Sequence, residues 1–261
     1  MIVLDDIPFT LETADVLERL HLDESSQYSG EVAAIVERAV PLARPRAAYR
    51  VGFVHERDAE AVVLATRPRS AEAVCEQALH NGQVQPLGRN AGAADRPAHR
   101  VRFASRALSR NLREVERVFV YVATCGPELD EIAAGDVFAE FVRDTVKELA
   151  LWAALAHLYD HLTATFGLTT LASMNPGSGD QRVWPIEQQR DLFEFVGDVT
   201  GSIGVALTDS CMMLPNKSVS GVFFPSREGF ENCHLCLQKR CPNRRAAFDP
   251  RLWERVFTAE T

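Results

Sequence analysis

One long stretch with helical spacing constrains the fold of this chain more than any other feature. Residues 136–166 read DVFAEFVRDTVKELALWAALAHLYDHLTATF, in which apolar residues recur at intervals of three and four without an internal Gly or Pro. This pattern predicts a single long helix whose apolar surface must be covered by other elements, so we expect it to be a central packing element. His157 and His161, four residues apart within it, are interpreted as structural residues rather than metal ligands.

Shorter helices and strands are predicted on both sides of this stretch. Helical spacing indicates helices over residues 9–20, where Thr10 is expected to cap the N-terminus, and over residues 29–40. Residues 185–197 have the pattern of a short amphipathic helix. Strands are predicted over 47–56, 61–66 and 115–124, and as a pair within 201–225 that is broken at Pro215. The mixture of elements indicates an α+β fold.

The composition restricts the class of protein and its partners. The chain has 261 residues, of which 46% are hydrophobic, so it can bury a substantial core. With 28 basic against 36 acidic residues, its formal net charge of -8 argues against nucleic acid as a partner. No positively charged leader and no apolar stretch of about 20 residues is visible, so we expect no membrane contact and a cytoplasmic location.

Three cysteines cluster near the end of the chain, within ENCHLCLQKRCPNRR, residues 231–245. The spacing Cys233-x2-Cys236-x4-Cys241 is typical of thiolates that bind one metal ion or cluster. The chain has six cysteines in all, and their uneven distribution indicates reduced thiols rather than a disulfide framework. A closed metal site needs four ligands, so a fourth must come from elsewhere.

Two loops earlier in the chain are suited to bind a small ligand. Residues 175–179 read NPGSG, with two glycines that can adopt positive φ and leave backbone amides unshielded. Residues 217–221 read KSVSG, in which a cation and two hydroxyls suit a carboxylate, a phosphate or a ribose. The candidate cofactor-binding residues are Asn175, Pro176, Gly177, Ser178, Gly179, Lys217, Ser218 and Ser220.

The order of these loops carries a resemblance. NPGSG is followed by WPIEQQRDLFEFVG and then by IGVALTDSCMMLPNKSVSGVFF. Together these segments resemble the reactivation domain of cobalamin-dependent methionine synthase, which binds S-adenosylmethionine, and more closely its stand-alone relatives, some of which end in a cysteine cluster. The earlier VFVYVATCGPELDEIA is similar to the family's strand, turn and helix start. The likeness covers roughly residues 47–245 with gaps, and TDSCMMLPNKSVSG, residues 208–221, is its most specific part.

The resemblance implies a twisted antiparallel sheet with flanking helices and a C-terminal metal-binding segment. It also implies that the NPGSG loop lies against the methionine part of S-adenosylmethionine, which the family presents to Co(II) cobalamin. One electron and a methyl transfer then restore methylcobalamin. This chain has Ser173 and Ser178 where the family carries an arginine and a tyrosine. Without that arginine, Lys217 or the loop amides would have to bind the ligand carboxylate.

Cys211 and Cys125 are the two predictions for the fourth metal ligand. Cys211 lies between the predicted strands of residues 201–225, whose pairing at Pro215 would carry it toward the clustered cysteines. Cys125 stands at the turn TCGPE. Cys75 lies in helical sequence, where a small buried side chain is expected. His234 directly follows Cys233, which makes ligation by both awkward. The predicted metal residues are Cys211, Cys233, Cys236 and Cys241.

The identity of the metal is left open between two choices. Cys241-Pro242 and the neighbouring basic residues favour a [4Fe-4S] cluster, because Pro follows the last cysteine in many cluster-binding runs and positive charge favours the reduced cluster. Zinc would instead pin a tail that is too polar to fold by burial alone. A metal-free redox or structural role is the third interpretation.

These features predict three segments within one compact unit: an N-terminal α+β part over 1–80, an activation-domain-like core over 81–230 that starts with a linker at 81–99, and a cysteine-rich tail over 231–261. The functional hypothesis is a corrinoid-linked accessory protein that supports reductive reactivation or methyl transfer. The corrinoid would come with a partner, because the chain has no Asp-x-His-x-x-Gly motif. One alternative is a non-catalytic binding module with structural zinc. The other is a methyltransferase that acts on an unrelated substrate, but this chain lacks the Gly-rich loop expected of doubly wound methyltransferases.

Overall fold

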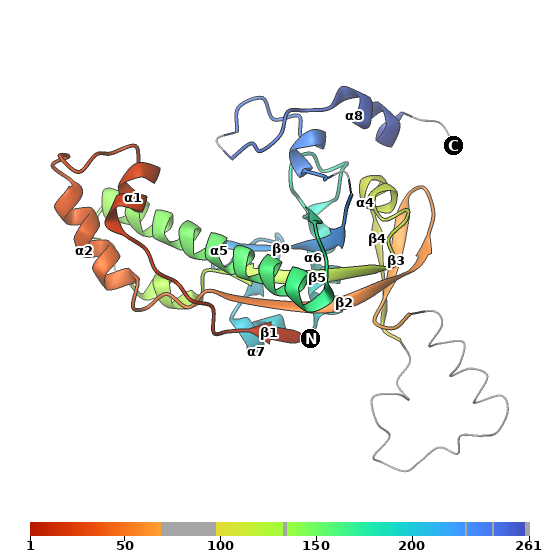
Figure 1. The fold of residues 1–261 in the computed structure, drawn as a ribbon, viewed down its shortest axis with the longest axis horizontal. Coiled ribbons are helices and arrows are strands. Elements are labelled where there is room, and N and C mark those ends of the chain that lie inside the picture. The colour runs from red at the N-terminus through yellow and green to blue at the C-terminus, as the bar shows by residue number, and fades with distance from the viewer. Residues whose placement is uncertain (69–97, 133–134, 228, 242, 259–261) are drawn as a thin grey trace, which may run out of the picture. The chain divides into compact units, whose positions relative to one another are not determined.

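A computed structural model describes residues 1–68, 98–132, 135–227, 229–241 and 243–258. Cys75 and all but the last two residues of the predicted linker at 81–99 lie outside these ranges. Figure 1 shows the elements. The strands are β1 (Ile2–Leu4), β2 (Arg46–Arg57), β3 (Ala61–Ala65), β4 (Arg100–Ala104), β5 (Arg117–Thr124), β6 (Leu171–Met174), β7 (Ala206–Leu207), β8 (Met213–Leu214) and β9 (Ser218–Pro225). The α-helices are α1 (Thr13–Arg19), α2 (Ser29–Ala39), α4 (Arg106–Asn111), α5 (Val137–Phe166), α6 (Gln189–Val196), α7 (Val199–Ile203) and α8 (Pro250–Phe257), and the 3-10 helices are η1 (Pro127–Glu131), η2 (Ile186–Gln188) and η3 (Asn232–Leu235).

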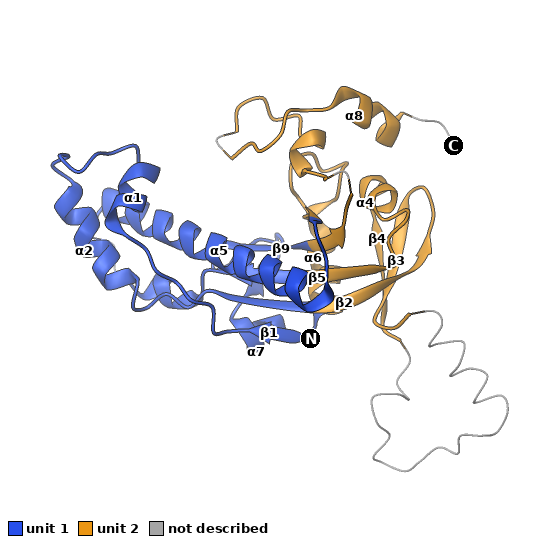
Figure 2. Cartoon of the chain, viewed as in Figure 1, with its two compact units in different colours: residues 1–49, 121–171, 196–221 blue, residues 50–120, 172–195, 222–261 orange. Residues whose placement is uncertain are grey.

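The chain divides into two compact units, which Figure 2 distinguishes by colour. Unit 1 comprises residues 1–49, 121–171 and 196–221, and unit 2 comprises residues 50–120, 172–195 and 222–261. Each unit is therefore assembled from three separate pieces of sequence. The segments expected at 1–80, 81–230 and 231–261 are not these units, and as domains they stay a prediction.

The main sheet has the strand order β4-β3-β2-β5-β9-β6, with β1 paired to β2. The pairs β1 with β2, β2 with β3, and β3 with β4 are antiparallel. The three strands predicted over 47–56, 61–66 and 115–124 are present as β2, β3 and β5. Their sequences are rich in Val and aromatic residues, which favour strands. Apolar residues alternate with polar ones where one face of the sheet is buried, and run continuously where both faces are buried. The predicted α+β class, with an antiparallel sheet and flanking helices, is confirmed.

Unit 1 is built around α5, the long helix predicted from residues 136–166. The Asp136 side chain accepts a hydrogen bond from the Ala139 N–H at 2.8 Å and so caps its first turn. Helices α1 and α2 lie alongside α5 in Figure 1 and bury a shared apolar surface against it. The fully buried members of this core include Val16, Val32, Ala39, Leu129, Val142, Val146 and Ala150.

His161 of α5 has a structural role, as predicted. Its Nε2 lies 3.0 Å from the Tyr49 hydroxyl, within hydrogen-bonding distance. Burial raises the pKa of that hydroxyl, so Tyr49 stays protonated at neutral pH and can donate this bond. A ring nitrogen engaged in this way has no need of a metal partner.

The prediction that Thr10 caps the first helix was wrong. The helix begins at Thr13, and Glu12 is its N-cap. The Glu12 N–H donates to the Asp15 carboxylate at 3.1 Å, and the Glu12 side chain accepts from the N–H of Asp15, which completes a capping box. Two carboxylates at this spacing satisfy the N-terminus of the helix, with the N-cap two residues later than the sequence pattern indicated.

The predicted break at Pro215 is present, because β8 ends at Leu214 and β9 begins at Ser218. The pairing expected across this break was wrong: β8 pairs with β7, through Ala206 with Leu214 and Leu207 with Met213, so the chain reverses over residues 208–212. The Thr208 N–H donates to the Met212 carbonyl at 2.9 Å, which closes this reversal. Cys211 lies inside it with a φ of 62°. The turn chemistry of Thr, Asp and Ser overrode the apolar pattern from which the strand was predicted.

The core of unit 2 is aromatic. Phe103 of β4 and Trp184 meet edge to face, with ring centroids 5.7 Å apart, and both are buried. The Ser105 hydroxyl donates to the Val183 carbonyl at 2.6 Å and accepts from the Leu108 N–H, so one side chain caps α4 and ties it to the segment before η2. Trp184 therefore fills the core of this unit.

In the described part of the chain, no helix is both long and apolar enough to cross a membrane.

Candidate functional site

The NPGSG loop, residues 175–179, follows β6 in unit 2 and is held in a fixed shape. Gly177 and Gly179 have φ values of 74° and 85°, in the left-handed region that favours glycine. The Gly177 N–H donates to the Trp184 carbonyl at 2.8 Å, and the Ser178 N–H donates to the Asn175 carbonyl at 3.2 Å. A Cβ at position 177 would lie 2.9 Å from Ile186, so a side chain there would collide with its neighbour.

The cysteine segment, residues 231–245, packs against this loop within unit 2. A Cβ built on Gly179 would lie 3.1 Å from the Cys236 Cβ and 3.3 Å from its Sγ. The Asn232 Nδ2 donates to the Asn175 Oδ1 at 2.9 Å, across 57 residues of sequence. The fold thus brings together two segments that the sequence singled out separately. The buried Oδ1 of Asn232 accepts no hydrogen bond among the described residues.

A salt bridge beyond the loop fixes its far side. The Arg182 guanidinium donates to both carboxylate oxygens of Asp180, at 2.8 and 2.7 Å. These bonds lower the pKa of Asp180 to about 2. Arg182 also lies over the Trp253 ring, 4.8 Å from its centroid, and so links the loop to α8.

The cysteine segment has internal order of its own. The Cys236 N–H donates to the Cys233 carbonyl at 3.2 Å, which closes a turn at the end of η3. The Arg245 N–H donates to the Cys233 Sγ at 3.4 Å. Arg244 donates to the carbonyls of Cys233 at 3.3 Å and Cys236 at 3.4 Å. Cys233, Cys236 and Cys241 are all partly exposed.

The described residues do not form the predicted metal site. Among the residues that the structure describes, no group of three or more His, Cys, Asp or Glu side chains is placed to hold a metal ion. The arrangement therefore does not fit a bound cluster or zinc ion as it stands. Cys233, Cys236 and Cys241 belong to unit 2, whereas Cys211 and Cys125, the two predictions for the fourth ligand, belong to unit 1.

Cys125 and Cys211 are both buried in unit 1. Burial raises the pKa of the Cys125 thiol to about 12, so this residue stays protonated at neutral pH. Its Sγ lies 3.3 Å from the Gly126 carbonyl, to which it donates a weak hydrogen bond. A protonated, buried thiol is a poor metal ligand, which makes Cys125 the weaker of the two predictions.

Lys217 and Ser218 lie in unit 1 and are engaged in contacts there. The Lys217 Nζ lies 2.7 Å from the Asp144 carboxylate and 3.9 Å from that of Glu148, both on α5. Partial burial alone would raise the pKa of Asp144, but hydrogen bonds from Lys217 and Asn216 outweigh it and hold that pKa below its ordinary value. The positive charge of Lys217 is thus already balanced by two carboxylates.

The hydroxyls of the KSVSG loop face inward. Ser218 donates to the Pro215 carbonyl at 2.8 Å and lies 2.9 Å from the Thr124 hydroxyl. The Cys125 N–H donates to the Lys217 carbonyl at 3.0 Å, which ties the loop to the end of β5. Ser220 is buried in β9. These contacts support the corner of the sheet and leave the two serines directed into the protein.

Sequence reasoning missed three residues that organise the site in unit 2. Asn232 and Arg244 lie inside the cysteine segment, whose function was predicted from the cysteine spacing alone. Arg182 follows the NPGSG loop. Only the D-x-R spacing of Asp180 and Arg182 carries a local signal, since an Asp can accept from a side chain two residues later. Asn232 acts through a long-range contact with Asn175, and Arg244 acts through carbonyls of its own segment that no local pattern identifies in advance.

Comparison with known proteins gives a structural resemblance. No family model and no curated protein matches the chain. Among solved structures, the fold is similar to a crystal structure of the MetH reactivation domain bound to AdoHcy, with a TM-score of 0.46 and 14% sequence identity. The alignment covers 83% of this chain and 70% of that one.

Proposed function

We propose that this protein is a corrinoid-linked accessory protein that binds S-adenosylmethionine and supports reductive reactivation, or methyl transfer, for a cobalamin-dependent methyltransferase. One electron from a separate donor, together with the methyl group of S-adenosylmethionine, would convert Co(II) cobalamin to methylcobalamin and leave S-adenosylhomocysteine. The partner would carry the cobalamin.

One observation carries this proposal: within unit 2, the NPGSG loop and the cysteine segment lie against each other, at Gly179 with Cys236 and at Asn175 with Asn232. A ligand-binding loop and a redox-active group that act on one reaction must be close together, because electron and methyl transfer both need short distances. The sequence order of the loops supports the same function through its resemblance to the reactivation domain.

The ligand carboxylate would be bound by backbone amides. Lys217 is neutralised by Asp144 and Glu148, so it is not the replacement for the missing family arginine. In the described part of the chain, no hydrogen bond engages the Gly179 N–H, and a carboxylate is a good acceptor for exposed amides in a loop of positive-φ residues. The short Ser173 and Ser178 side chains would leave room for it.

The cysteines are proposed to bind a [4Fe-4S] cluster, with zinc as the alternative metal. The cluster would supply single electrons. Cys233, Cys236 and Cys241 are partly exposed, and the Arg245 N–H already faces the Cys233 sulfur at 3.4 Å. Because the described residues form no metal group, binding would require the segment to close around the metal, with Cys211 as the proposed fourth ligand and Cys125 as the alternative.

Anaerobic purification followed by iron, sulfide, zinc and absorption measurements tests the cluster. About four irons per chain, with absorption that bleaches on reduction, is the expected result. Stoichiometric zinc without colour, or no metal at all after reconstitution with iron and sulfide, would refute it. The triple variant of Cys233, Cys236 and Cys241 to Ser should lose the metal, whereas Cys125→Ser should keep it.

Calorimetry with S-adenosylmethionine and S-adenosylhomocysteine tests ligand binding independently. We expect one site per chain, lost in Gly179→Val, where a side chain would meet Cys236 and an unfavourable φ. Gly30→Val is the matched control, since a Cβ at Gly30 meets nothing within 4 Å. Absence of binding to the wild type would contradict the proposal.

A second candidate function is a non-catalytic binding module of the same fold. Arg244 favours it, because its hydrogen bonds to carbonyls of Cys233, Cys236 and Ala246 order the cysteine segment without any metal. A protein that binds neither S-adenosylmethionine nor iron, and still associates with a cobalamin protein, would have this function.

A further inference from the structure

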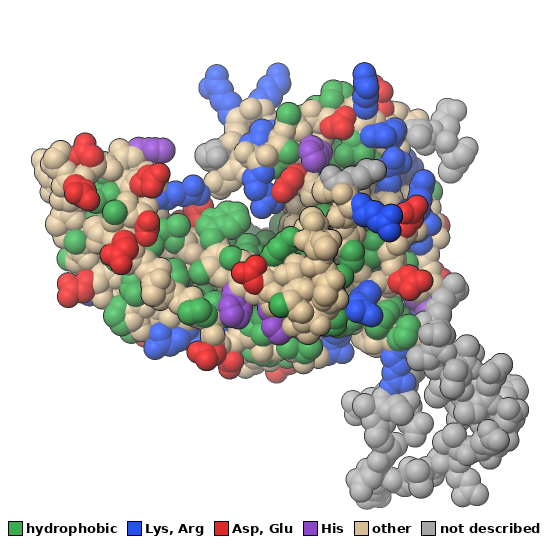
Figure 3. All heavy atoms as spheres, in the orientation of Figure 1, with side chains coloured by type: hydrophobic (Ala, Val, Ile, Leu, Met, Phe, Trp, Pro, Cys, Tyr) green, Lys and Arg blue, Asp and Glu red, His purple; other side chains and the backbone are tan. Residues whose placement is uncertain are grey.

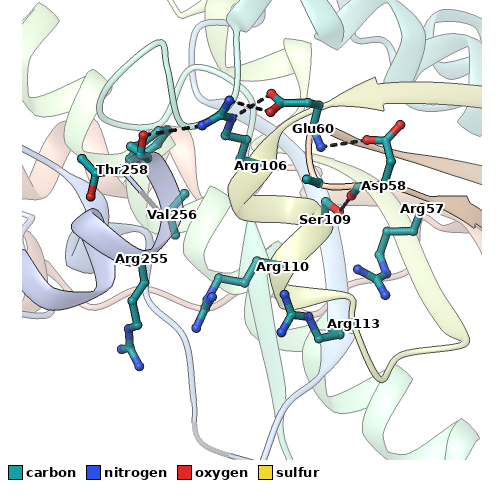
Figure 4. A pocket seen from close by; sticks show the side chains of 12 residues that line it. Arg57, Asp58, Glu60, Arg106, Ser109, Arg110, Arg113, Arg255, Val256 and Thr258 are labelled. Atoms are coloured by element: carbon teal, nitrogen blue, oxygen red, sulfur yellow. Dashed lines mark hydrogen bonds and ion pairs between the residues drawn. The ribbon is translucent and has the colours of Figure 1, made fainter. Parts of the chain in front are cut away.

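An arginine-rich pocket lies in unit 2, lined by residues that the proposed function does not use. Its volume is about 480 Å³, within the range of small-molecule sites. The β2–β3 turn, α4 and α8 supply the lining. Five arginines contribute to it: Arg57, Arg106, Arg110, Arg113 and Arg255. Figure 4 shows the pocket, with these side chains coming from several elements.

The two acidic residues of the lining are already engaged. Glu60 pairs with Arg106 at 2.5 Å. Asp58 accepts the N–H groups of Glu60 and Ala61, each at 2.7 Å, which caps the β2–β3 turn and lowers the pKa of its carboxyl. Five guanidinium groups against two carboxylates leave a formal charge of +3 in the lining. Figure 4 shows Arg106 turned toward Glu60 and away from the other arginines.

The other four arginines form no ion pair within 4 Å in the described part of the chain, and Arg255 interacts only at longer range with the Asp249 carboxylate. Arg57, Arg110 and Arg113 form no ion pair there, and Arg255 donates only to the Arg251 carbonyl at 3.3 Å. Partial burial, together with the positive charges of Arg255 and Arg113, lowers the pKa of Arg110. Like charges held together at the edge of a pocket destabilise the protein unless an anion binds between them.

The pocket is held in shape by hydrogen bonds. The Ser109 hydroxyl donates to the Asp58 carbonyl, which ties α4 to the β2–β3 turn. Arg106 also reaches the Phe257 carbonyl at the end of α8, at 3.5 Å. Arg106, Arg110 and Arg113 follow the spacing i, i+4, i+7, so helical geometry puts them on one side of α4 and the turn after it. In Figure 3, Lys and Arg side chains gather over the part of the surface where Figure 1 places α4 and α8.

We propose that this pocket binds a small ligand that carries a chain of two or more phosphoryl groups. A chain of this kind concentrates three or four negative charges in a small volume, which matches the unpaired guanidinium groups. The planar fork of Arg binds two phosphate oxygens at once, so several phosphoryl groups in a row offer each guanidinium its own pair of oxygens. The same chemistry is found in inorganic polyphosphate and in nucleoside di- and triphosphates.

Calorimetry on the full chain at constant ionic strength tests this proposal. We expect tripolyphosphate to bind at one site per chain, more tightly than pyrophosphate, and pyrophosphate more tightly than inorganic phosphate. Citrate, a polycarboxylate of similar charge, should bind more weakly than tripolyphosphate. Absence of tripolyphosphate binding, or equal affinity for citrate, would overturn the proposal. Titration with ATP and ADP identifies which kind of molecule supplies the phosphate chain. Affinity above that of the inorganic chains indicates a nucleotide, and equal affinity indicates that the phosphate chain alone is recognised. Both results support the site.

Arginine variants distinguish this site from general attraction of anions. Arg113→Ala and Arg255→Ala should each weaken tripolyphosphate binding roughly tenfold, the loss expected for one charge-assisted contact. Both residues are exposed, so the variants should fold normally. Arg251→Ala is the matched control, since Arg251 is exposed on the same helix and does not line the pocket. Equal weakening by Arg251→Ala and Arg255→Ala would overturn the proposal. Binding of S-adenosylmethionine should be unchanged in all three variants.

Discussion

At the scale of single residues, the cysteines differ sharply in their surroundings. Cys125 is fully buried in the apolar core of unit 1, among side chains such as Leu129 and Val142. Cys233, Cys236 and Cys241 are partly exposed, on a segment rich in basic residues. Because the thiolate is the reactive form, burial that keeps a thiol protonated, as at Cys125, slows its reactions and its metal binding, whereas exposure favours both.

Alkylation rates should follow this division. With iodoacetamide at pH 8 and mass spectrometric detection, we expect Cys233, Cys236 and Cys241 to be modified at least about tenfold faster than Cys125, whose pKa is about 12. In denaturant the difference should disappear. Comparable rates for all four in the native protein would show that the Cys125 environment is more open than its burial indicates.

Asp180 should make the stability of the protein depend on acidity. Its pKa is lowered from 3.8 to about 2 in the folded protein by the hydrogen bonds from Arg182. A carboxyl with a depressed folded pKa stabilises the fold above its unfolded pKa, and this contribution is lost as pH falls from about 4 to about 2. Asp180→Asn should therefore lower the Tm at pH 7 by a small amount, at most about 2 °C, because Arg182 is largely exposed to solvent.

Thermal melts of the wild type and Asp180→Asn at several pH values measure this effect. The difference in Tm between the two proteins should shrink as pH falls below 4. Asp5→Asn provides a control in unit 1, at an exposed carboxyl that forms no hydrogen bond or ion pair with the described residues. A difference that is constant down to pH 2.5 would mean that the Asp180 charge does not contribute.

At the scale of elements, α5 combines an apolar side with an ionic side. Ala154, Leu158 and Leu162 are completely buried, at the spacing of one helical face. Lys147 lies on this same face and is also buried, and its Nζ lies 2.5 Å from the Asp130 carboxylate. Asp144 and Glu148, on the neighbouring side of the helix, both pair with Lys217. The helix therefore anchors the core of unit 1 and also orders the KSVSG loop through charge.

Leu158→Ala should destabilise the protein strongly. Removing a fully buried Leu side chain loses transfer free energy and leaves a cavity, at a cost of about 2–5 kcal/mol. Trp152→Ala is the control on the same helix, because Trp152 is 40% exposed and should cost much less. Urea denaturation gives both free energies of unfolding. Equal losses would place the packed face of α5 elsewhere.

At the scale of the whole molecule, the two units share strands. Residues of β2, β5 and β9 fall in both units, so neither unit has a complete set of strands without the other. Domains that fold independently are instead joined by exposed linkers. This division through continuous strands predicts that the two units unfold together.

Tryptophan fluorescence can test this cooperativity. Trp152 lies in unit 1, and Trp184 and Trp253 lie in unit 2. One variant keeps only Trp152 and another keeps only Trp184. In each variant, the urea midpoint from tryptophan fluorescence should equal the midpoint from far-UV circular dichroism of that same variant. Separate midpoints within one variant would indicate that the units unfold in two steps.

Much of this architecture could be predicted from the sequence. The α5 helix, α2 and strands β2, β3 and β5 follow from periodicity, because burial of one face selects apolar residues at fixed intervals. The cysteine spacing and the NPGSG loop were visible for a similar reason, since local backbone demands favour Cys-x-x-Cys turns and glycine at positive φ. Short elements such as β1, α7 and α8 were missed, because too few residues carry the pattern.

Only the tertiary structure decided what those local signals contact. In the tertiary structure Lys217 pairs with Asp144 and Glu148, and Cys236 lies against Gly179. Cys125 is buried, which raises the pKa of its thiol to about 12. The tertiary structure also gathers arginines from a turn and two helices into one pocket. Each of these depends on residues far apart in the chain, whose proximity is set by the packing of whole elements. The sequence identifies which chemical groups each residue carries. The fold determines whether those groups contact a partner residue, are buried in the core or are exposed to solvent.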